Sequence, residues 1–506
     1  MPEYIGAIDQ GTSSSRFMVF ARTGEIVSSH QIEHDTHFSS PGWAEHDPEM
    51  IFTNVQECIR KTVEKMVQQG LEPRDIRAIG ITNQRETTCV WDKSTGRPLH
   101  NAIVWLDVRT RETVDSLIQK TDSKKADHFL TDCGLPLATY FSAVKLRWLL
   151  DHVPEVAKAQ EDGRLQVGTV DSWLIYKLTG GCSTGVHVTD VTNASRTMLM
   201  NLKTLQWDDA LCNFFGVDRA ALPEIRSSSE TYGVLADGPL KGLPVAGCLG
   251  DQQAALVGQL CMSPGEAKNT YGTGCFMLFN TGSTPIISRN GLLTTVGYQL
   301  GKTAPAVYAL EGSIAIAGAA VKWLRDNLGI IQSAEEINVL ASNVSDSAGV
   351  YFVPAFSGLF APHWRPDARG CIVGLTQYST KEHIARAALE AVCLQTKEIL
   401  LAMNSDSGHP LTSLKVDGGL TNSDLCMQIQ ANVIGITVER PKMRETTALG
   451  AALAAGLAVG VWASVDEFRS KQSIDRFESK SDEQERERMF NKWKKAIEKS
   501  LGWEES

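Results

Sequence analysis

Residues 5–16 combine an acid, a glycine and a run of hydroxyls in a pattern suited to binding phosphate. They read Ile-Gly-Ala-Ile-Asp-Gln-Gly-Thr-Ser-Ser-Ser-Arg and continue into an apolar run at 17–20. Two apolar runs around a glycine turn predict a β-hairpin, whose tip could direct N–H groups and hydroxyls at phosphate oxygens. Asp9, at the end of the first strand, is the kind of anionic partner that hydrated Mg²⁺ needs. An N-terminal hairpin with a polar tip and no ligand fits the same pattern.

A second segment, at 267–279, repeats this pattern. It reads Ala-Lys-Asn-Thr-Tyr-Gly-Thr-Gly-Cys-Phe-Met-Leu-Phe, and its Gly-Thr pair at 272–273 echoes the pair at 11–12. Two similar domains, each presenting a hydroxyl-bearing hairpin to one central cleft, would explain both the echo and the length of the chain. A third glycine-rich turn, at 416–422, would let a flat or anionic ligand approach the backbone closely, although a generic turn reads the same way.

An acid lies between the two hairpins, in the sequence Gly-Cys-Leu-Gly-Asp-Gln-Gln-Ala-Ala at 247–255. Asp251 follows an apolar strand and precedes an alanine-rich helix. This is a good place for a general base, because the helix N-terminus stabilises a carboxylate and the strand end fixes its position. Asp is also a common helix N-cap, and both roles could hold at once.

Composition limits the class of protein. The 506 residues carry a formal net charge of −10, which argues against a nucleic-acid binder, and the length favours two domains. The 11 cysteines include no C-x-x-C pair, so we expect neither a zinc site nor a disulfide framework. The run at 448–463 is rich in Ala and Gly and too short and weakly apolar for a membrane span, so it predicts a buried helix. We expect no membrane association and no signal peptide.

Strands and helices alternate along the chain, which predicts an α/β fold with polar residues at the strand ends. Asp47 and Pro48 predict a helix start, and apolar residues from 51 to 67 give that helix one apolar face. Further predicted elements are strands at 26–33, 76–82, 88–91 and 101–106 and helices at 142–151 and 171–178.

Taken together, these segments resemble the carbohydrate kinase family built on the actin-like ATPase fold. The resemblance spans roughly residues 4 to 460 and rests on several motifs in the family's order. They are Asp-Gln-Gly-Thr-Ser-Ser-Ser-Arg at 9–16, Asn-Gln-Arg-Glu-Thr-Thr at 83–88, Gly-Asp-Gln-Gln-Ala-Ala at 250–255, Tyr-Gly-Thr-Gly-Cys-Phe at 271–276, Gly-Cys-Ile-Val-Gly-Leu at 370–375 and Asp-Gly-Gly at 417–419.

The resemblance implies two similar ribonuclease H-like α/β domains around a central cleft. Residues 1–257 would carry the polyol site and the first phosphate hairpin. Residues 258–506 would carry the second phosphate hairpin, the adenosine site and a C-terminal amphipathic helix at 481–501. That helix is expected to pack back onto the body, with binding to a partner as the alternative.

The resemblance also implies an activity, the ATP-dependent phosphorylation of glycerol to sn-glycerol 3-phosphate by direct in-line transfer, with Asp251 as general base. The implied polyol-binding residues are Arg85, Glu86, Trp105, Tyr140, Asp251, Gln252 and Phe276. Arg85 and Glu86 could instead form a plain ion pair, and Trp105 or Phe276 could be ordinary core residues.

ATP and Mg²⁺ are the implied cofactors. By resemblance, Asp9 and Asp251 would hold the Mg²⁺. The implied ATP contacts are Thr12, Ser13, Ser14, Arg16, Gly272, Thr273, Gly318, Gly419 and Asn422. The sequence departs from the family pattern at Lys322, where Gln is frequent, and at Ser423, where Asn is usual. The resemblance therefore does not assign the adenine contacts at these two positions.

Two other functions fit the residues. One is a kinase of the same family that acts on a larger sugar such as xylulose or gluconate. The other is an actin- or chaperone-like ATPase that uses the nucleotide to switch conformation and needs no acceptor. By resemblance we expect a homo-oligomer, either a dimer or a tetramer. The cytoplasm is the default compartment, and a peroxisome-like organelle is the exception to test.

Overall fold

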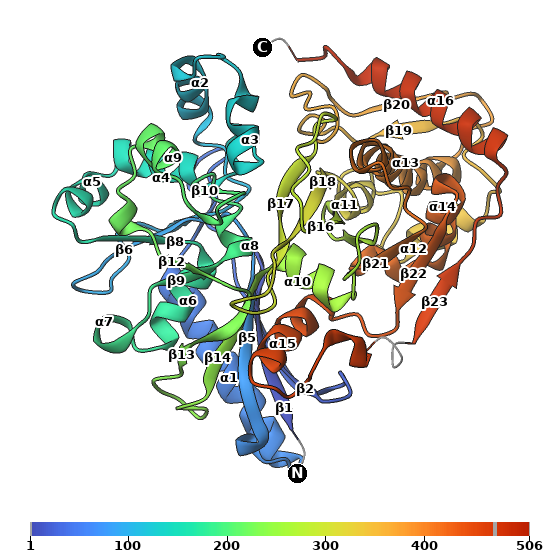
Figure 1. Cartoon of the computed structure of the whole chain (residues 1–506). Coiled ribbons are helices and arrows are strands. Elements are labelled where there is room, and N and C mark those ends of the chain that lie inside the picture. Colours follow the sequence, from blue (N-terminus) through green and yellow to red (C-terminus); the bar gives the residue numbers. More distant parts are fainter. Residues whose placement is uncertain (1–2, 469–472, 505–506) are drawn as a thin grey trace.

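Both predicted hairpins form, and each lies within its own large sheet (Figure 1). The computed structural model describes residues 3–468 and 473–504. The first sheet has the strand order β13-β14-β5-β1-β2-β3. Its strands are β1 (Tyr4–Gln10), β2 (Ser14–Ala21), β3 (Ile26–Glu33), β5 (Ile76–Asn83), β13 (Ser229–Val234) and β14 (Pro244–Gly250). The parallel strands β1, β5 and β14 end side by side, with Asp9 opposite Thr82 and Gly250 opposite Asn83.

The second sheet repeats the hairpin and its parallel neighbour. Its order is β17-β18-β16-β15-β21-β22-β23, with β15 and β16 antiparallel and β15 and β21 parallel. The strands are β15 (Ala267–Tyr271), β16 (Cys275–Gly282), β17 (Leu293–Tyr298), β18 (Val307–Ile314), β21 (Ser413–Asp417), β22 (Thr437–Pro441) and β23 (Ile474–Phe477). The repetition predicted from the sequence is therefore confirmed as a repetition of structure.

Helices and short strands complete the two halves. The helices are α1 (Pro48–Gln68), α2 (Arg111–Lys120), α3 (Leu130–Cys133), α4 (Ser142–His152), α5 (Pro154–Glu161), α6 (Val170–Leu178), α7 (Gly181–Thr184), α8 (Val191–Ala194), α9 (Asp209–Phe215), α10 (Asp251–Gly258), α11 (Gly318–Asp326), α12 (Glu336–Ser342), α13 (Lys381–Ser407), α14 (Asp424–Ile434), α15 (Thr446–Ala458) and α16 (Glu483–Ser500). The short strands are β4 (Glu45–His46), β6 (Cys89–Asp92), β7 (Ala102–Ile103), β8 (Leu165–Gly168), β9 (Val188–Asp190), β10 (Met200–Asn201), β11 (Gln206–Trp207), β12 (Glu224–Arg226), β19 (Tyr351–Val353) and β20 (Cys371–Val373).

Helix α15 joins the two halves. It belongs to the late part of the chain, yet it packs on α10 and on β1, β5 and β14 of the first sheet (Figure 1). Glycines allow this close contact, because a Cβ on Gly80 would lie 2.0 Å from the Ala451 carbonyl oxygen and one on Gly450 1.8 Å from that of Ala254. Burial all around the helix explains why its sequence is almost entirely small and apolar.

Most local predictions are confirmed, and two need correction. Asp47 caps α1 by accepting a 2.9 Å hydrogen bond from the Glu49 N–H. Val67, however, is 57% exposed and does not belong to the apolar face of α1. The strand expected at 101–106 shrinks to β7, because the chain turns at Val104, whose carbonyl accepts from the Asp107 N–H.

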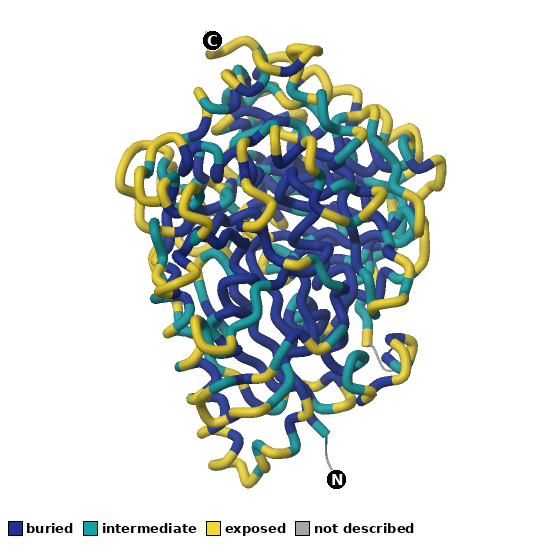
Figure 2. The backbone as a smooth tube through the Cα atoms, turned by 60° about the vertical axis from the view of Figure 1, so that its left-hand side comes forward, coloured by how far each residue is buried: buried dark blue, intermediate teal, exposed yellow. Residues whose placement is uncertain are grey.

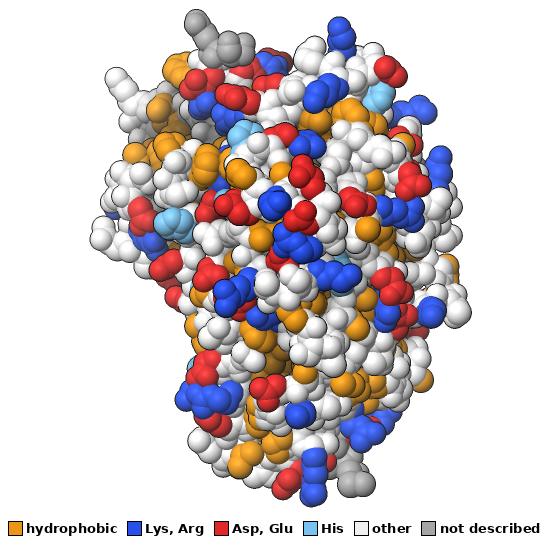
Figure 3. All heavy atoms as spheres, turned by 90° about the vertical axis from the view of Figure 1, so that its left-hand side faces the viewer, with side chains coloured by type: hydrophobic (Ala, Val, Ile, Leu, Met, Phe, Trp, Pro, Cys, Tyr) orange, Lys and Arg blue, Asp and Glu red, His pale blue; other side chains and the backbone are white. Residues whose placement is uncertain are grey.

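The C-terminal helix packs back onto the body, as expected. Phe490, Trp493 and Ile497 of α16 are buried against the core of the second half. Buried residues fill the interior of both halves and exposed residues lie mainly in the outer loops (Figure 2). On the face shown in Figure 3, basic and acidic side chains are interspersed and form no single basic patch. Among the described residues, no helix is both long and apolar enough to cross a bilayer.

Candidate active site

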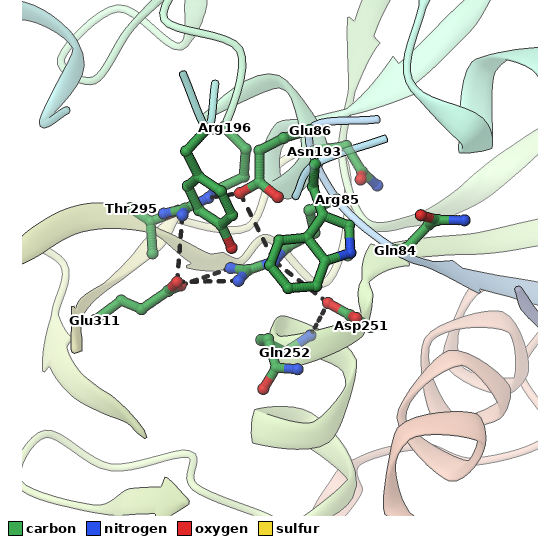
Figure 4. Close-up of polar contacts among 12 residues, drawn as sticks. Gln84, Arg85, Glu86, Asn193, Arg196, Asp251, Gln252, Thr295 and Glu311 are labelled. Atoms are coloured by element: carbon green, nitrogen blue, oxygen red, sulfur yellow. Dashed lines mark hydrogen bonds and ion pairs between the residues drawn. The ribbon is translucent and has the colours of Figure 1, made fainter. Parts of the chain in front are cut away.

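Arg85 lies at the centre of a buried charge network where β5 ends (Figure 4). Its two terminal nitrogens donate to both carboxylate oxygens of Glu311, at 2.5 and 2.9 Å. Its Nε lies 3.3 Å from Oδ1 of Asp251. Because Glu311 belongs to β18, this arginine connects the first half to the sheet of the second. We call Arg85, Glu86, Arg196, Asp251 and Glu311 the acceptor cluster.

A second arginine completes the acceptor cluster. Arg196 donates from Nε to Glu86 at 2.6 Å and from Nη2 to Glu311 at 3.2 Å. Burial works to raise the pKa of Glu311, but Arg196 and Arg85 outweigh it and hold that pKa at about 2. Burial raises the pKa of Glu86, against the opposing effect of the same two arginines. Glu86 also has a φ of +58°, a left-handed conformation that costs energy and is concentrated at functional sites.

Asp251 is the first residue of α10, and Gly250 occupies the N-cap position. The N-cap alternative for Asp251 is therefore wrong. Its Oδ1 accepts from the Gln252 N–H at 2.7 Å, as a carboxylate at a helix N-terminus can. The side chain is 30% exposed, so a ligand could reach it. Burial raises the pKa of Asp251, and the cations Arg85 and Lys268 oppose that rise.

Three aromatic side chains form a corner beside the acceptor cluster. Trp105 meets Tyr140 edge-on with ring centroids 5.6 Å apart, and it meets Phe276 edge-on at 6.1 Å. All three are partly exposed, which argues against the alternative that Trp105 or Phe276 is ordinary core. The indole N–H of Trp105 donates to the Thr12 hydroxyl at 2.9 Å and so links this corner to the first hairpin.

The two hairpin tips, residues 11–14 and 272–274, form what we call the phosphate end. In the first tip, the Gly11 N–H donates to the Ser14 carbonyl at 2.9 Å, and the side chain of Ser13 is exposed. Asp9 is buried beneath this tip and is paired with Arg16. Arg16 also donates to Glu445 at 2.7 Å, at the start of α15. Burial raises the pKa of Asp9, and Arg16 opposes the rise.

The second tip is held against the start of α11. The Gly318 N–H donates to the Gly272 carbonyl at 3.0 Å, and Thr273 is exposed beside it. A Cβ on Gly318 would lie 2.6 Å from that carbonyl oxygen, so only glycine allows this contact. The structure thus places Gly318, predicted to lie on the nucleoside side, in contact with Gly272 and next to Thr273, which are predicted to bind the phosphates.

On the predicted nucleoside side, Gly419 has open space around the position of a Cβ, and Asn422 is exposed. The Ser423 hydroxyl accepts a hydrogen bond from the Cys426 N–H as the N-cap of α14, and it donates one to the side-chain oxygen of Asn338. Ser423 is therefore committed to local structure, which leaves Asn422 as the candidate contact. Lys322 lies exposed on α11.

The residues proposed for Mg²⁺ suit a hard divalent cation. Asp9 and Asp251 supply carboxylate oxygens, the donors that Mg²⁺ prefers. They are close enough that the charge of Asp9 contributes to raising the pKa of Asp251. A divalent cation between them would remove this repulsion, so the donor set fits the ion.

Three charged residues of the site were missed by the sequence predictions. They are Arg196, Lys268 and Glu311, all buried. The sequence did contain a signal for two of them, because Lys268 and Glu311 are single charges within otherwise apolar or neutral strands. Charged side chains are rarely buried without a partner, so a lone charge in such a strand indicates a paired site.

Comparisons with known proteins give matches over nearly the whole chain. Models of the N-terminal and C-terminal domains of the FGGY family of carbohydrate kinases match residues 4–258 and 267–459. The glycerol kinase of Pseudarthrobacter chlorophenolicus is 55% identical over 505 residues, covering 99% of each chain. The glycerol kinase of Methylorubrum populi is 56% identical over 506 residues, covering 100% of this chain and 99% of that one.

Solved structures give the same fold. The crystal structure of Plasmodium falciparum glycerol kinase with ADP matches with a TM-score of 0.92 at 40% identity, covering 99% of this chain and 98% of that one. A gluconate kinase from Lactobacillus acidophilus matches with a TM-score of 0.85 at 21% identity and shares the fold alone. The predicted two-domain, actin-like fold is confirmed.

Proposed function

Because this chain belongs to the FGGY family of carbohydrate kinases, we propose that it transfers the γ-phosphoryl group of ATP to glycerol and releases sn-glycerol 3-phosphate and ADP. The identities of about 55% to curated glycerol kinases over the full chain support glycerol as the acceptor. One structural observation carries the proposal. The acceptor cluster and its aromatic corner lie beside a phosphate end built from two matching hairpins.

The acceptor cluster offers the hydrogen-bond partners that a small polyol needs. Arg85 is a donor, and Glu86 and Asp251 are acceptors. Gln252, outside the cluster, follows Asp251 at the start of α10 and adds a further amide. The aromatic corner would cover the carbon chain of the polyol. A site built to bond hydroxyls rejects analogues that lack them far better than an apolar pocket does.

In the proposed step, Asp251 accepts the proton of a terminal hydroxyl while that oxygen forms a bond to the γ-phosphorus of ATP. The bond from the γ-phosphorus to the β,γ-bridging oxygen breaks in line, and ADP carries away the electron pair. Catalysis then rests on positioning and charge stabilisation, with no covalent intermediate on the enzyme. Arg85, 3.3 Å from Asp251, helps to keep that carboxylate ionised and able to take the proton.

The phosphate end would orient the nucleotide. Thr12, Ser13, Ser14 and Arg16 on one side and Gly272 and Thr273 on the other would contact phosphate oxygens. Asp9 and Asp251 would hold Mg²⁺, which when bound neutralises phosphate charge. Gly318, Gly419 and Asn422 would lie along the nucleoside.

A coupled assay of ADP release tests the proposal. Mg-ATP is supplied with glycerol, xylulose, gluconate or no acceptor. We expect strong turnover with glycerol and a quiet blank. Turnover with xylulose or gluconate alone would overturn glycerol as the substrate, and ATP hydrolysis indifferent to every acceptor would indicate a conformational switch instead.

The homo-oligomer, dimer or tetramer, stays a prediction that follows from the family. Light scattering coupled to size-exclusion chromatography measures it directly. The compartment likewise stays a prediction.

A further inference from the structure

Lys268 is a buried cation beside the acceptor cluster that the mechanism above leaves without a role. It lies on β15 in the second sheet, and its side chain is fully buried. Its ammonium donates to the Gln252 side-chain oxygen, to the Thr270 hydroxyl at 2.9 Å and to the Phe276 carbonyl at 3.3 Å. An ammonium has three donors and no acceptor, so all its hydrogen-bonding capacity is used within the protein.

These contacts fix the orientation of one side chain. Because an ammonium can only donate, the Gln252 atom that faces it must be the carbonyl oxygen, not the amide nitrogen. The opposite end of the amide then presents two N–H donors. Within the part of the chain that the structure describes, the Gln252 amide nitrogen makes no hydrogen bond of its own. That donor is therefore available to a ligand.

The orientation matters for the direction of proton transfer. A hydroxyl placed between Gln252 and Asp251 would accept from the amide and donate to the carboxylate. Its proton would then point at the group proposed to remove it. If the amide were reversed, its oxygen would compete with Asp251 for that proton.

We propose that Lys268 is the positioning residue that fixes Gln252 as a hydrogen-bond donor to the acceptor hydroxyl and so directs the hydroxyl proton to Asp251. The inference rests on the proposed function, because it assumes that the acceptor lies against Gln252 and Asp251. The inference adds Lys268, from β15 of the second sheet, to the residues that shape the acceptor site. Its side chain contacts Gln252 on α10.

The neighbouring strand provides a matched control. Lys415 on β21 is the direct strand partner of Lys268, and its side chain is also largely buried. Its ammonium donates to the Leu260 carbonyl at 3.0 Å, near the other end of α10. Lys268→Met and Lys415→Met therefore remove the same charge from adjacent positions of one sheet, and only the first frees Gln252.

The experiment measures kcat and KM with glycerol and with 1,2-propanediol, which lacks one terminal hydroxyl, in the wild type and both variants. For Lys268→Met we expect kcat with glycerol to fall at least about tenfold, with the KM for ATP little changed. The kcat with 1,2-propanediol should fall by a similar factor, because that diol keeps a terminal hydroxyl that can receive the phosphoryl group. Lys415→Met should keep the wild-type kcat with both acceptors. Wild-type kinetics in Lys268→Met would overturn the inference.

A double-mutant cycle separates positioning from general packing. If Lys268 acts through Gln252, Lys268→Met should add little to the loss already caused by Gln252→Ala. Additive losses would overturn the inference. Should Lys268→Met fail to fold, Gln252→Glu keeps the lysine paired but can only accept a hydrogen bond. We expect that variant to lose turnover at an unchanged melting temperature, and full turnover would contradict the proposal.

The result can be told apart from failure of the proposed function. A wild type that ignores glycerol but phosphorylates another polyol would overturn the substrate, and the Lys268 comparison would then be made with that polyol. A wild type that uses glycerol, together with a Lys268→Met variant that matches Lys415→Met, would overturn the inference alone. A wild type that uses no acceptor would overturn both.

Discussion

Side chains build the acceptor cluster, whereas the backbone builds much of the phosphate end. In the acceptor cluster, Arg85 is held by both oxygens of Glu311, and Arg196 by Glu86 and Glu311. At the phosphate end, the Gly11 N–H donates a hydrogen bond to the Ser14 carbonyl, and the Gly318 N–H donates one to the Gly272 carbonyl. The acceptor cluster depends on charge, whereas the Gly318–Gly272 contact of the phosphate end depends on the absence of a side chain.

The difference matches what each end has to recognise. Phosphate oxygens are alike in every nucleotide, so N–H groups from glycine turns suffice to bind them. A polyol is recognised only by the directions of its hydroxyls, which requires donors and acceptors fixed in place. Substitutions that change charge should therefore impair glycerol binding and catalysis at the acceptor cluster most. Substitutions that add a Cβ should impair ATP binding at the phosphate end most.

The largest effect should come from Asp251→Asn. Loss of a positioned general base typically costs roughly 10²–10⁴-fold in rate, so we expect a fall of that size in kcat while ATP still binds. Steady-state kinetics and ATP titration measure the two quantities. Asp237→Asn changes an exposed acid in the turn between β13 and β14, at the opposite end of β14 from Asp251, and serves as the control. Near-normal turnover in Asp251→Asn would rule out the general-base role.

Glu311→Gln should come next. Removing one member of a buried ion pair costs about 3–5 kcal/mol in unfolding free energy, because the remaining charge stays buried. Glycerol KM should rise as Arg85 loses its orientation. Glu390→Gln breaks a partly buried pair, with Arg386 at 2.8 Å, on helix α13 of the second half. Denaturant unfolding should show a loss for both variants, whereas only Glu311→Gln should alter glycerol KM.

Gly318→Ala tests the phosphate end. Its Cβ would collide with the Gly272 carbonyl oxygen, so the second hairpin must move, and we expect kcat/KM for ATP to fall roughly tenfold to a hundredfold. Gly419→Ala has room for its Cβ, so a loss of ATP affinity there would report contact with the nucleotide rather than a shifted backbone. An unchanged kcat/KM for ATP in Gly318→Ala would contradict the predicted backbone construction.

Trp105→Phe should have the smallest effect and tests whether the two ends communicate. The change keeps an aromatic ring but removes the hydrogen bond to Thr12. One such bond contributes about 1 kcal/mol, or roughly fivefold in affinity. We expect modest rises in the KM for both glycerol and ATP. A change in glycerol KM alone would show that the hydrogen bond does not couple the ends.

Local motifs made much of the site predictable. Residues 9–16 and 83–88 are contiguous, and each lies at a strand end, so their position follows from the strand itself. Helix signals such as Asp47 before Pro48 act within a few residues and were equally readable. Apolar spacing was less reliable, since Val67 continues the pattern of α1 but lies near its exposed end.

The remaining charges of the site could not be assigned from the sequence. Glu311 lies 226 positions from Arg85, and nothing in its own segment identifies that partner. Arg196 and Lys268 likewise acquire their roles only when both sheets are in place. Pairing across the two halves is a property of the folded chain, and periodicity or capping signals cannot report it.

The contact between α15 and the first sheet has a consequence for biosynthesis. Strands β1, β5 and β14 leave the ribosome early, but the helix that covers them begins only at residue 446. Until then, the surfaces around Gly80 and Gly247, which fit against Ala451 and Ala455, have no covering helix. A nascent chain of this length exposes apolar surface for tens of seconds at usual elongation rates of about 5–20 residues per second. The protein should therefore depend on chaperones during synthesis. Chains that end before residue 446, made from truncated mRNAs, should aggregate.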